Sequence, residues 1–530
     1  MGFSAHDALV LLGLLAAGAA LLALAPTFRV PYPILLVLGG VAVGFVPGVP
    51  HVALRPEIVL VALLPPLLYS AAFFTSLRDL RANARPLSLL AIGLVLATVV
   101  GVAAACHAGI SGLSWPTCFV IGAIVAPTDA VAATAIASRL GVPRRLVAIL
   151  EGESLINDAT ALVAYAFAVT AVMTGHFSFW HAAWRFPVDV VGGIAIGLGV
   201  GLLLRQIRRH LDHSPSEIAI ALLSGYFAYL PAQAAGVSGV LAVVTVGVYV
   251  GWYTPELTTV QTRLQGDAVW EILVFLLNAL LFGLVGLQLR PILDALSGTS
   301  TTTLLADAVI VSGAVVVSRF VWVFPATYVP RYLFRRVRER DPYPPWQYPT
   351  LISWAGLRGA VSLAAALALP LTTDAGSPFP SRELVIYLAF SVIIATLVLQ
   401  GLSLPLVIGV LGLEEDRVAA KEEVKARIHA AEAAIGRLEE LAGEDWVRDD
   451  TAERLRGLYR FRQSRFAARF DAEDDGALEQ RSRDYQRLRR ELLDAERRAV
   501  VELRRQGRIN DEIMNLVQRD LDLEDARLDI

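Results

Sequence analysis

Cysteine is nearly absent from this chain, which has two among 530 residues. Cys106 and Cys118 both lie in apolar segments, without the spacing of a metal or redox motif, so we interpret them as buried free thiols. The formal net charge is only -3, which provides no overall basic signal for nucleic acid. We therefore expect neither a cofactor nor a nucleic-acid partner.

The motifs of several functional classes are missing as well. There is no HExxH or Gly-x-Ser-x-Gly sequence, and none of the eight histidines lies in the middle of a predicted span, so an intramembrane protease or esterase is poorly supported. The absence of a Walker A sequence argues against pumping driven by ATP. No repeated filter sequence favours a channel. We therefore expect a protein that is not an enzyme.

Long apolar blocks dominate the sequence instead. The chain is 55% hydrophobic, with a mean hydropathy of +0.57, whereas soluble proteins are about 45–50% apolar. Blocks of roughly 17–25 residues, long enough to cross a bilayer, recur over residues 1–412, which we assign to a transmembrane domain. Residues 413–530 are predicted to form a helical cytoplasmic tail, because 54 of the chain's 95 charged residues follow Leu413.

The apolar blocks predict thirteen membrane spans and an orientation. The spans cover residues 7–25, 31–48, 57–75, 87–108, 116–138, 146–172, 188–206, 216–235, 237–253, 270–289, 304–329, 349–370 and 384–411. One set of loops carries 16 arginines and the opposite set carries 4. The positive-inside rule places the arginine-rich loops in the cytoplasm. We therefore expect a multi-pass protein of the plasma membrane with its N-terminus outside and its tail in the cytoplasm. No basic segment precedes the first span, so a cleaved signal peptide is not expected.

Helix breakers interrupt two of the predicted spans. Pro127 lies in the fifth span, and Gly356 and Gly359 lie in the twelfth. If the seventh span is a linker, the remaining spans form two inverted six-helix repeats, and the interrupted helix is the fifth of each. Paired broken helices in inverted repeats indicate the binding site of a transporter. The predicted fold class is all-α and integral to the lipid bilayer, with two interrupted crossing helices and a helical tail.

Acidic residues lie inside these apolar segments. A charged side chain at that depth costs about 3 kcal/mol or more, so Asp129 and Asp158 are expected to face a protein interior or a water-filled path. Ser154 precedes Asp158 by one helical turn on the same face, and Thr128 adds a hydroxyl beside Asp129. Such oxygen ligands suit Na⁺ or Li⁺. Because burial penalises the charged form of a carboxylate, one acid can hold either a proton or a cation, which is sufficient for exchange.

Two arginines also lie within predicted spans. Arg358 needs a buried partner, and Glu153 is the candidate. We favour a structural role for this pair, because breaking a buried ion pair commonly costs about 3–5 kcal/mol. Arg319 is either a tether or a side chain that extends toward the cytoplasmic interface, and we favour the latter.

Three motifs resemble one known family. Residues 126–130 (APTDA), 151–158 (EGESLIND) and 353–360 (SWAGLRGA) together resemble the sodium/proton exchanger branch of the monovalent cation:proton antiporters, in its bacterial form with a cytoplasmic tail. The resemblance implies a homodimer in which one bundle moves against a fixed interface. It implies that Asp158 carries the ion and the proton, and that Glu153 and Arg358 form a buried pair. The residues that would complete the ion site are Asn157, Asp129, Thr128 and Ser154.

The resemblance also bears on stoichiometry and has one departure. Related electrogenic antiporters have two adjacent acids where this chain has Asn157 and Asp158, so the resemblance implies electroneutral exchange of Na⁺ for H⁺, for pH and sodium homeostasis. Members usually have an acid after the aromatic residue that follows Pro-Pro-Leu-Leu, whereas Tyr69 here precedes Ser70. This difference puts in doubt any gate that depends on the acid.

The sequence is compatible with several alternative functions. Na⁺, Li⁺ and K⁺ all take oxygen ligands, so a K⁺/H⁺ antiporter fits the same residues. A cation channel regulated by the tail and a membrane sensor are candidates of other classes. In the tail, an apolar stripe predicts an amphipathic or coiled-coil helix, and a second, weaker stripe follows closer to the C-terminus. The stripes comprise Val424, Ile428, Ala431, Ile435 and Leu438, and then Tyr485, Leu488, Leu492 and Ala499.

Overall fold

A computed structural model describes residues 31–46, 58–175, 179–211, 213–413, 417–468 and 477–526. The chain divides into two compact units, Met1–Glu415 and Asp416–Ile530. The described residues are arranged in helices without a β-strand, which confirms the predicted all-α class. The predicted span over residues 7–25 lies outside the described residues.

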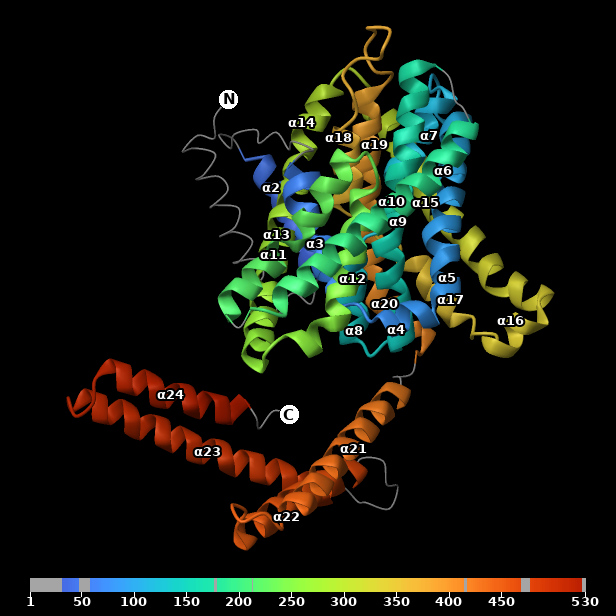
Figure 1. Cartoon of the computed structure of the whole chain (residues 1–530). Coiled ribbons are helices and arrows are strands. Elements are labelled where there is room, and N and C mark those ends of the chain that lie inside the picture. The colour runs from blue at the N-terminus through green and yellow to red at the C-terminus, as the bar shows by residue number, and fades with distance from the viewer. Residues whose placement is uncertain are drawn as a thin grey trace. The chain divides into compact units, whose positions relative to one another are not determined.

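The first unit is a bundle of helices (Figure 1). Its first half contains α2 (Tyr32–Gly44), η1 (Ile58–Leu63), α3 (Leu64–Phe74), α4 (Leu77–Ala82), α5 (Ala84–Ser88), η2 (Leu89–Leu94), α6 (Val95–Gly109), α7 (Trp115–Val125), α8 (Ala130–Arg139), α9 (Arg144–Thr174) and α10 (Phe179–Arg208). Its second half contains α11 (Ser214–Ala234), α12 (Gly239–Leu257), α13 (Val260–Leu287), α14 (Leu289–Ala295), α15 (Thr301–Leu333), α16 (Arg335–Arg340), α17 (Gln347–Trp354), α18 (Ala360–Leu367), α19 (Arg382–Ala395), η3 (Thr396–Gln400) and α20 (Gly401–Leu411).

Seven continuous helices within the described ranges are long and apolar enough to cross a membrane. They are Ala84–Gly109, Arg144–Thr174, Trp184–Arg208, Gly239–Leu257, Val260–Ala295, Thr301–Leu333 and Arg382–Leu411. Three shorter apolar helices accompany them, at Tyr32–Gly44, Val59–Phe74 and Trp115–Val125. These helices agree with the predicted multi-pass membrane protein, while the count of thirteen spans and the inverted repeats stay predictions.

Both predicted interruptions are confirmed. Ser114 caps the start of α7 by accepting a hydrogen bond from the backbone of Thr117, and the helix ends at Val125, two residues before Pro127. Asp129 then caps α8, because its Oδ1 accepts a hydrogen bond from the backbone N–H of Val131 at 2.9 Å. In the same way α17 ends at Trp354, and α18 begins only after Gly359.

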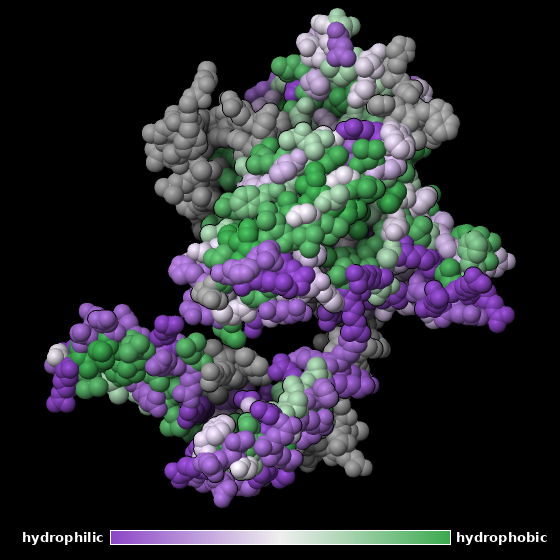
Figure 2. Space-filling view, in the orientation of Figure 1, coloured by the Kyte–Doolittle hydropathy of each residue, from purple (hydrophilic) through white to green (hydrophobic). Residues whose placement is uncertain are grey.

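The packing of the first unit surrounds these interruptions. One large apolar core joins α2, α7, α9, α15 and α17 to α20, and a second core joins α3, α10, α11 and α12. Figure 2 shows hydrophobic residues over the middle of the visible face, with hydrophilic residues gathered along its lower edge. Leu198, Leu203, Leu223 and Phe227 are among the exposed apolar side chains of α10 and α11. This distribution suits a surface that faces lipid.

The described residues of the second unit form four helices. These are α21 (Arg417–Leu441), α22 (Asp449–Ala468), α23 (Ala477–Arg505) and α24 (Asp511–Ala526). The first predicted stripe is buried or half-buried where α21 packs on α22, with Val424 and Ala431 both 6% exposed. The second stripe is exposed within this unit, because Leu493 instead faces the contact with α24.

Charge reinforces the pairing of the last two helices. Arg497 of α23 donates to Asp525 and Asp522 of α24 at 2.9 and 2.8 Å. These hydrogen bonds raise the pKa of the Arg497 guanidinium, and the bond to Asp525 makes the largest contribution.

Candidate ion-binding site

The two interruptions meet each other in the middle of the first unit. The backbone N–H of Asp129, between α7 and α8, donates to the carbonyl of Leu357, between α17 and α18, at 2.9 Å. Arg358 Nε donates to the carbonyl of Val125 at 2.7 Å. Backbone groups released by the breaks are thus satisfied across the crossing, which is how irregular backbone is tolerated inside a membrane protein.

Gly359 makes this close crossing possible. A Cβ atom added to Gly359 would lie 2.1 Å from Oδ2 of Asp129, a distance that real side chains do not adopt. Only glycine lets the Asp129 carboxylate lie directly against the α17–α18 break. The predicted weakening of the helix by glycine therefore has a second consequence, which is close packing with the other broken helix.

Helix α9 presents three predicted site residues to the α7–α8 break. Ser154 Oγ donates to the carbonyl of Thr128 at 2.9 Å and accepts from the N–H of Ala130 at 3.3 Å. Asn157 Nδ2 donates to Thr128 Oγ1 at 2.6 Å, and that hydroxyl donates to Glu153 Oε1 at 3.2 Å. The structure thus brings together the predicted neighbours on α9 and at the break.

These contacts sort the site residues by role. The hydroxyls of Thr128 and Ser154 already hold backbone and side chains of the crossing, so in this conformation they position the site. Oδ1 of Asn157 is buried and makes no hydrogen bond to the described residues. A buried acceptor without a donor is uncommon and indicates a place for water or a cation.

Glu153 has a different partner from the predicted one. Arg319 of α15 donates from Nη1 to Glu153 Oε1 at 2.6 Å and from Nη2 to Oε2 at 2.9 Å, in a bidentate pair. Both residues are 1% exposed. The prediction that Arg319 extends toward the interface is therefore wrong, and so is the assignment of Arg358 as the direct partner. Because Arg319 Nε also donates to the carbonyl of Ile352, it joins α9, α15 and α17.

Arg358 is buried in the same region, but its side chain donates hydrogen bonds to backbone carbonyl groups. Besides the carbonyl of Val125, its side chain donates to the carbonyl of Gly356, and its own N–H donates to Thr396 Oγ1 at 3.1 Å. Both arginines lie beside Gly356, where an added Cβ would collide with Arg319 and approach Arg358. Arg358 thus connects the two interrupted regions through carbonyl groups in place of a carboxylate.

Asp158 and Asp129 both line one large cavity. Its volume is about 800 Å³, and Thr128, Ser154 and Ser70 also line it. Asp158 is only 5% exposed. The two carboxylates therefore face open space inside the unit, which is the setting expected for functional acids in a membrane protein.

Three further acids along this cavity were not singled out from the sequence. Glu151, Asp267 and Glu271 line it, and none of the described lining residues is lysine or arginine. Asp267 and Glu271 are spaced by four residues on α13, which was the available signal. The predicted span began at residue 270 and left Asp267 in a loop, whereas α13 begins at Val260. The acids make the cavity attractive to cations.

Ser70 marks the departure noted in the sequence. It lines the cavity, and its hydroxyl donates to the carbonyl of Leu67, one turn earlier in α3, at 2.9 Å. The hydrogen-bonding need of this neutral side chain is met within its own helix. The cavity therefore lacks a carboxylate at this position.

Known proteins that resemble this chain do so over nearly the whole membrane unit. The family model described as "Sodium/hydrogen exchanger, transmembrane" matches residues 13–409. An uncharacterized Na⁺/H⁺ exchanger of Mycobacterium tuberculosis is 38% identical over 509 residues, which covers 94% of this chain and 92% of the relative. The Na⁺/H⁺ antiporter ApNhaP of Aphanothece halophytica is 32% identical over 500 residues, with 92% and 91% covered.

Two further similarities extend the comparison. A sodium, potassium, lithium and rubidium/H⁺ antiporter of Bacillus pumilus is 33% identical over 387 residues, which covers 71% of this chain and 57% of the relative. Among solved structures, the sodium proton antiporter MjNhaP1 of Methanocaldococcus jannaschii has a TM-score of 0.62 at 19% identity, covering 76% of this chain and 98% of that one. The latter shows a shared fold.

Proposed function

This chain belongs to the sodium/hydrogen exchanger family and is a transporter rather than an enzyme, and from that membership we propose that it exchanges Na⁺ for H⁺ across the cell membrane. Its role is pH and sodium homeostasis. The observation that carries the proposal is the placement of Asp158 and Asp129 on one acidic cavity, beside the crossing of two broken helices.

The chemistry requires one carboxylate with two alternative occupants. When Asp158 is ionised it binds the cation, with Asp129 contributing a second carboxylate at the crossing. When Asp158 is protonated, its affinity for the cation is lost. Burial makes the uncompensated charge costly, so proton and cation each neutralise the site and exclude one another. Each crossing of the membrane then carries either Na⁺ or H⁺.

The neighbours of Asp158 support an exchange of one proton for one cation. Glu153 is engaged by Arg319 in a bidentate pair, and Asp129 caps α8. Asn157 is neutral and holds Thr128. Asp158 is therefore the acid best placed to change its occupant during the cycle, and the proposed exchange is electroneutral.

Selectivity and assembly complete the proposal. K⁺ or Li⁺ exchange is the second candidate, favoured by the Bacillus pumilus relative that is named for several alkali cations. The proposed assembly is a homodimer in the plasma membrane, with the N-terminus outside and the tail in the cytoplasm. The orientation is supported by the excess of arginine in one set of loops.

Proton flux in proteoliposomes tests the proposal. The purified chain is reconstituted with a pH-sensitive dye inside, and Na⁺, Li⁺ and K⁺ are added in turn outside. We expect Na⁺ to drive proton efflux that saturates with concentration. A cation current without proton coupling would support the channel alternative, and a complete lack of flux from folded protein would support the sensor alternative.

A further inference from the structure

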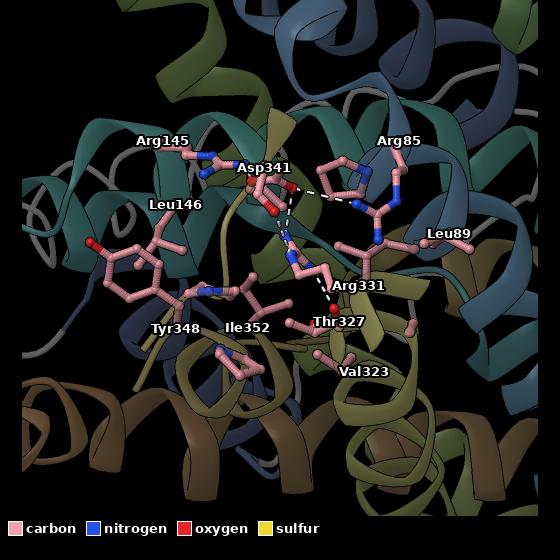
Figure 3. Close-up of a pocket in the computed structure, with 16 residues that line it drawn as sticks. Arg85, Leu89, Arg145, Leu146, Val323, Thr327, Arg331, Asp341, Tyr348 and Ile352 are labelled. Carbon is pink, nitrogen blue, oxygen red and sulfur yellow. Dashed lines mark hydrogen bonds and ion pairs between the residues drawn. The ribbon is translucent and has the colours of Figure 1, made fainter. Parts of the chain in front are cut away.

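A second, smaller cavity lies apart from the ion site and is surrounded by arginines. It is about 50 Å³ in volume and lies between α5 and η2, α9, α15 and α17 (Figure 3). Arg85, Arg145 and Arg331 line it, together with Asp341 at the end of α16. All three arginines belong to the set of predicted loops that the positive-inside rule assigns to the cytoplasm, although they lie at helix ends in the structure. The volume has room for about three or four water-sized atoms, which is similar to a phosphate group.

Positive charge exceeds negative charge around this cavity. Figure 3 shows the three guanidinium groups directed at the single carboxylate of Asp341. The Asp341 oxygens lie 2.9 Å from Arg145, 2.5 Å from Arg331 and 3.6 Å from Arg85. No other described lining residue is ionisable apart from Tyr348. One carboxylate therefore faces three guanidinium groups, and a surplus of two positive charges remains.

Arg85 supplies the free hydrogen-bonding capacity. Its Nη1 atom is buried and makes no hydrogen bond to the described residues, and its contact with Asp341 is the longest of the three. Each guanidinium nitrogen of Arg331 already donates a hydrogen bond, to the side chain or carbonyl of Asp341 or to the carbonyl of Thr327. A buried guanidinium N–H without an acceptor is costly, and phosphate oxygens are its strongest acceptors.

The rest of the cavity is apolar. Leu89, Leu146, Val323 and Ile352 line it beside the guanidinium groups, as Figure 3 shows. A basic end next to an apolar wall suits the phosphate end of a phospholipid, whereas a free phosphate ion gains nothing from the wall. Basic pockets between membrane helices on the cytoplasmic side are known to bind anionic headgroups.

We propose that this arginine pocket binds the phosphate of an anionic phospholipid, with Arg85 as the principal donor and Asp341 as an internal competitor for the arginines. The pocket joins three helices that also carry the ion site. Helix α9 carries Asp158, α15 carries Arg319, and α17 is the first half of a broken helix. A lipid bound here stabilises the arrangement of these helices around the crossing.

Lipid-dependent melting of the full-length protein in detergent tests the proposal. Phosphatidylglycerol, phosphatidylcholine and inorganic phosphate are titrated separately, and the half-saturating concentration is read from the rise in melting temperature. We expect wild-type protein to be stabilised by phosphatidylglycerol more than by phosphatidylcholine. In Arg85→Gln the half-saturating concentration of phosphatidylglycerol should rise about fivefold, the contribution of one arginine near a membrane surface.

Arg81→Gln is the matched control, because Arg81 is an exposed arginine of the same segment and does not line the pocket. Its half-saturating concentration should stay within twofold of wild type. Asp341→Asn should act in the opposite direction and bind phosphatidylglycerol more tightly, because the competing charge is removed. If Asp341→Asn is unfolded without lipid, the comparison of Arg85→Gln with Arg81→Gln is by itself the test of the proposal.

Three outcomes would overturn the proposal. Wild-type protein that does not distinguish phosphatidylglycerol from phosphatidylcholine has no anionic lipid site. Equal responses of the Arg85 and Arg81 variants would mean that the effect is a general surface attraction. Equal stabilisation by inorganic phosphate at the same concentration would show that the ligand is a soluble anion.

Discussion

Three acids near the crossing differ in what surrounds them. Glu153 is held by both terminal nitrogens of Arg319, and Asp129 caps α8 through Val131. Asp158 lies on the face of α9 that lines the acidic cavity. At the scale of single residues, partners therefore separate an acid held in an ion pair from one that faces the cavity. The identity of the side chain alone does not distinguish these acids.

The first prediction concerns Asp158. Asp158→Asn removes the titrating group and the ligand charge while keeping nearly the same shape, so Na⁺-driven proton flux should vanish and the melting temperature should change little. The measurement is the dye assay in proteoliposomes together with detergent melting. Glu151→Gln is the control, because Glu151 lines the same cavity one helical turn before Ser154 and should retain exchange at saturating Na⁺. Residual cation-dependent flux in Asp158→Asn would refute the assignment.

At the scale of elements, the Glu153–Arg319 pair joins α9 to α15. Arg319 also binds the carbonyl of Ile352 in α17, so one side chain connects three helices. The pair is fully buried, and removal of one partner leaves an uncompensated charge, which commonly costs about 3–5 kcal/mol. Removal of both partners costs less.

The second prediction is a double-mutant cycle on this pair. Arg319→Met should lower the melting temperature more than Glu153→Gln and Arg319→Met together, because the single variant strands a buried carboxylate. The same cycle with Arg358 serves as the comparison. Its coupling with Glu153 should be smaller, since Arg358 donates to backbone carbonyls. Strictly additive losses for Glu153 and Arg319 would contradict the observed pair.

The third prediction concerns the crossing of the broken helices. In Gly359→Ala the added Cβ would overlap Asp129 Oδ2, so the two breaks must separate and both stability and exchange should fall. Gly313→Ala in α15 is the control, because its added Cβ meets nothing within 4 Å and the change should be tolerated or slightly stabilising. Detergent melting and the flux assay measure both effects. Normal exchange in Gly359→Ala would show that close contact at the crossing is dispensable.

At the scale of the whole molecule, the cavity and the charge of the site together determine the cycle. The cavity carries five carboxylates, in Asp129, Asp158, Glu151, Asp267 and Glu271, and no lysine or arginine among its described lining residues. In the proposed exchange, the acids along this cavity should concentrate cations near Asp158 without changing the charge that crosses the membrane. The net charge moved per cycle depends only on the groups that change occupant.

The fourth prediction is that wild-type exchange is electroneutral. Proteoliposomes loaded with K⁺ and treated with valinomycin set the voltage at fixed Na⁺ and pH gradients. The initial rate of proton flux should be the same at zero and at inside-negative potential, because one Na⁺ is exchanged for one H⁺. A clear acceleration or slowing by voltage would mean that a second acid carries a proton. Asp129 would then be the first residue to substitute.

Much of this architecture was readable from the sequence because its causes are local. Apolar runs long enough to cross a bilayer, Pro127, and the glycines near Arg358 act on their own segments, and the structure has helices and breaks at those places. The pairing of Ser154 with the Asp158 face follows from helical spacing within α9. The boundaries were less accurate, since α13 begins ten residues before the predicted span.

The sequence by itself determined which residues carry charge inside the membrane, where the helices break, and that a transporter was to be expected. Only the tertiary structure decided which charges meet. Glu153 pairs with Arg319, 166 positions away in the chain, while Arg358 serves carbonyl groups. The acids of α13 line the same cavity as Asp158 only because the helices pack around it. The partner of a buried charge depends on which helices pack side by side, and no local pattern in the chain encodes that choice.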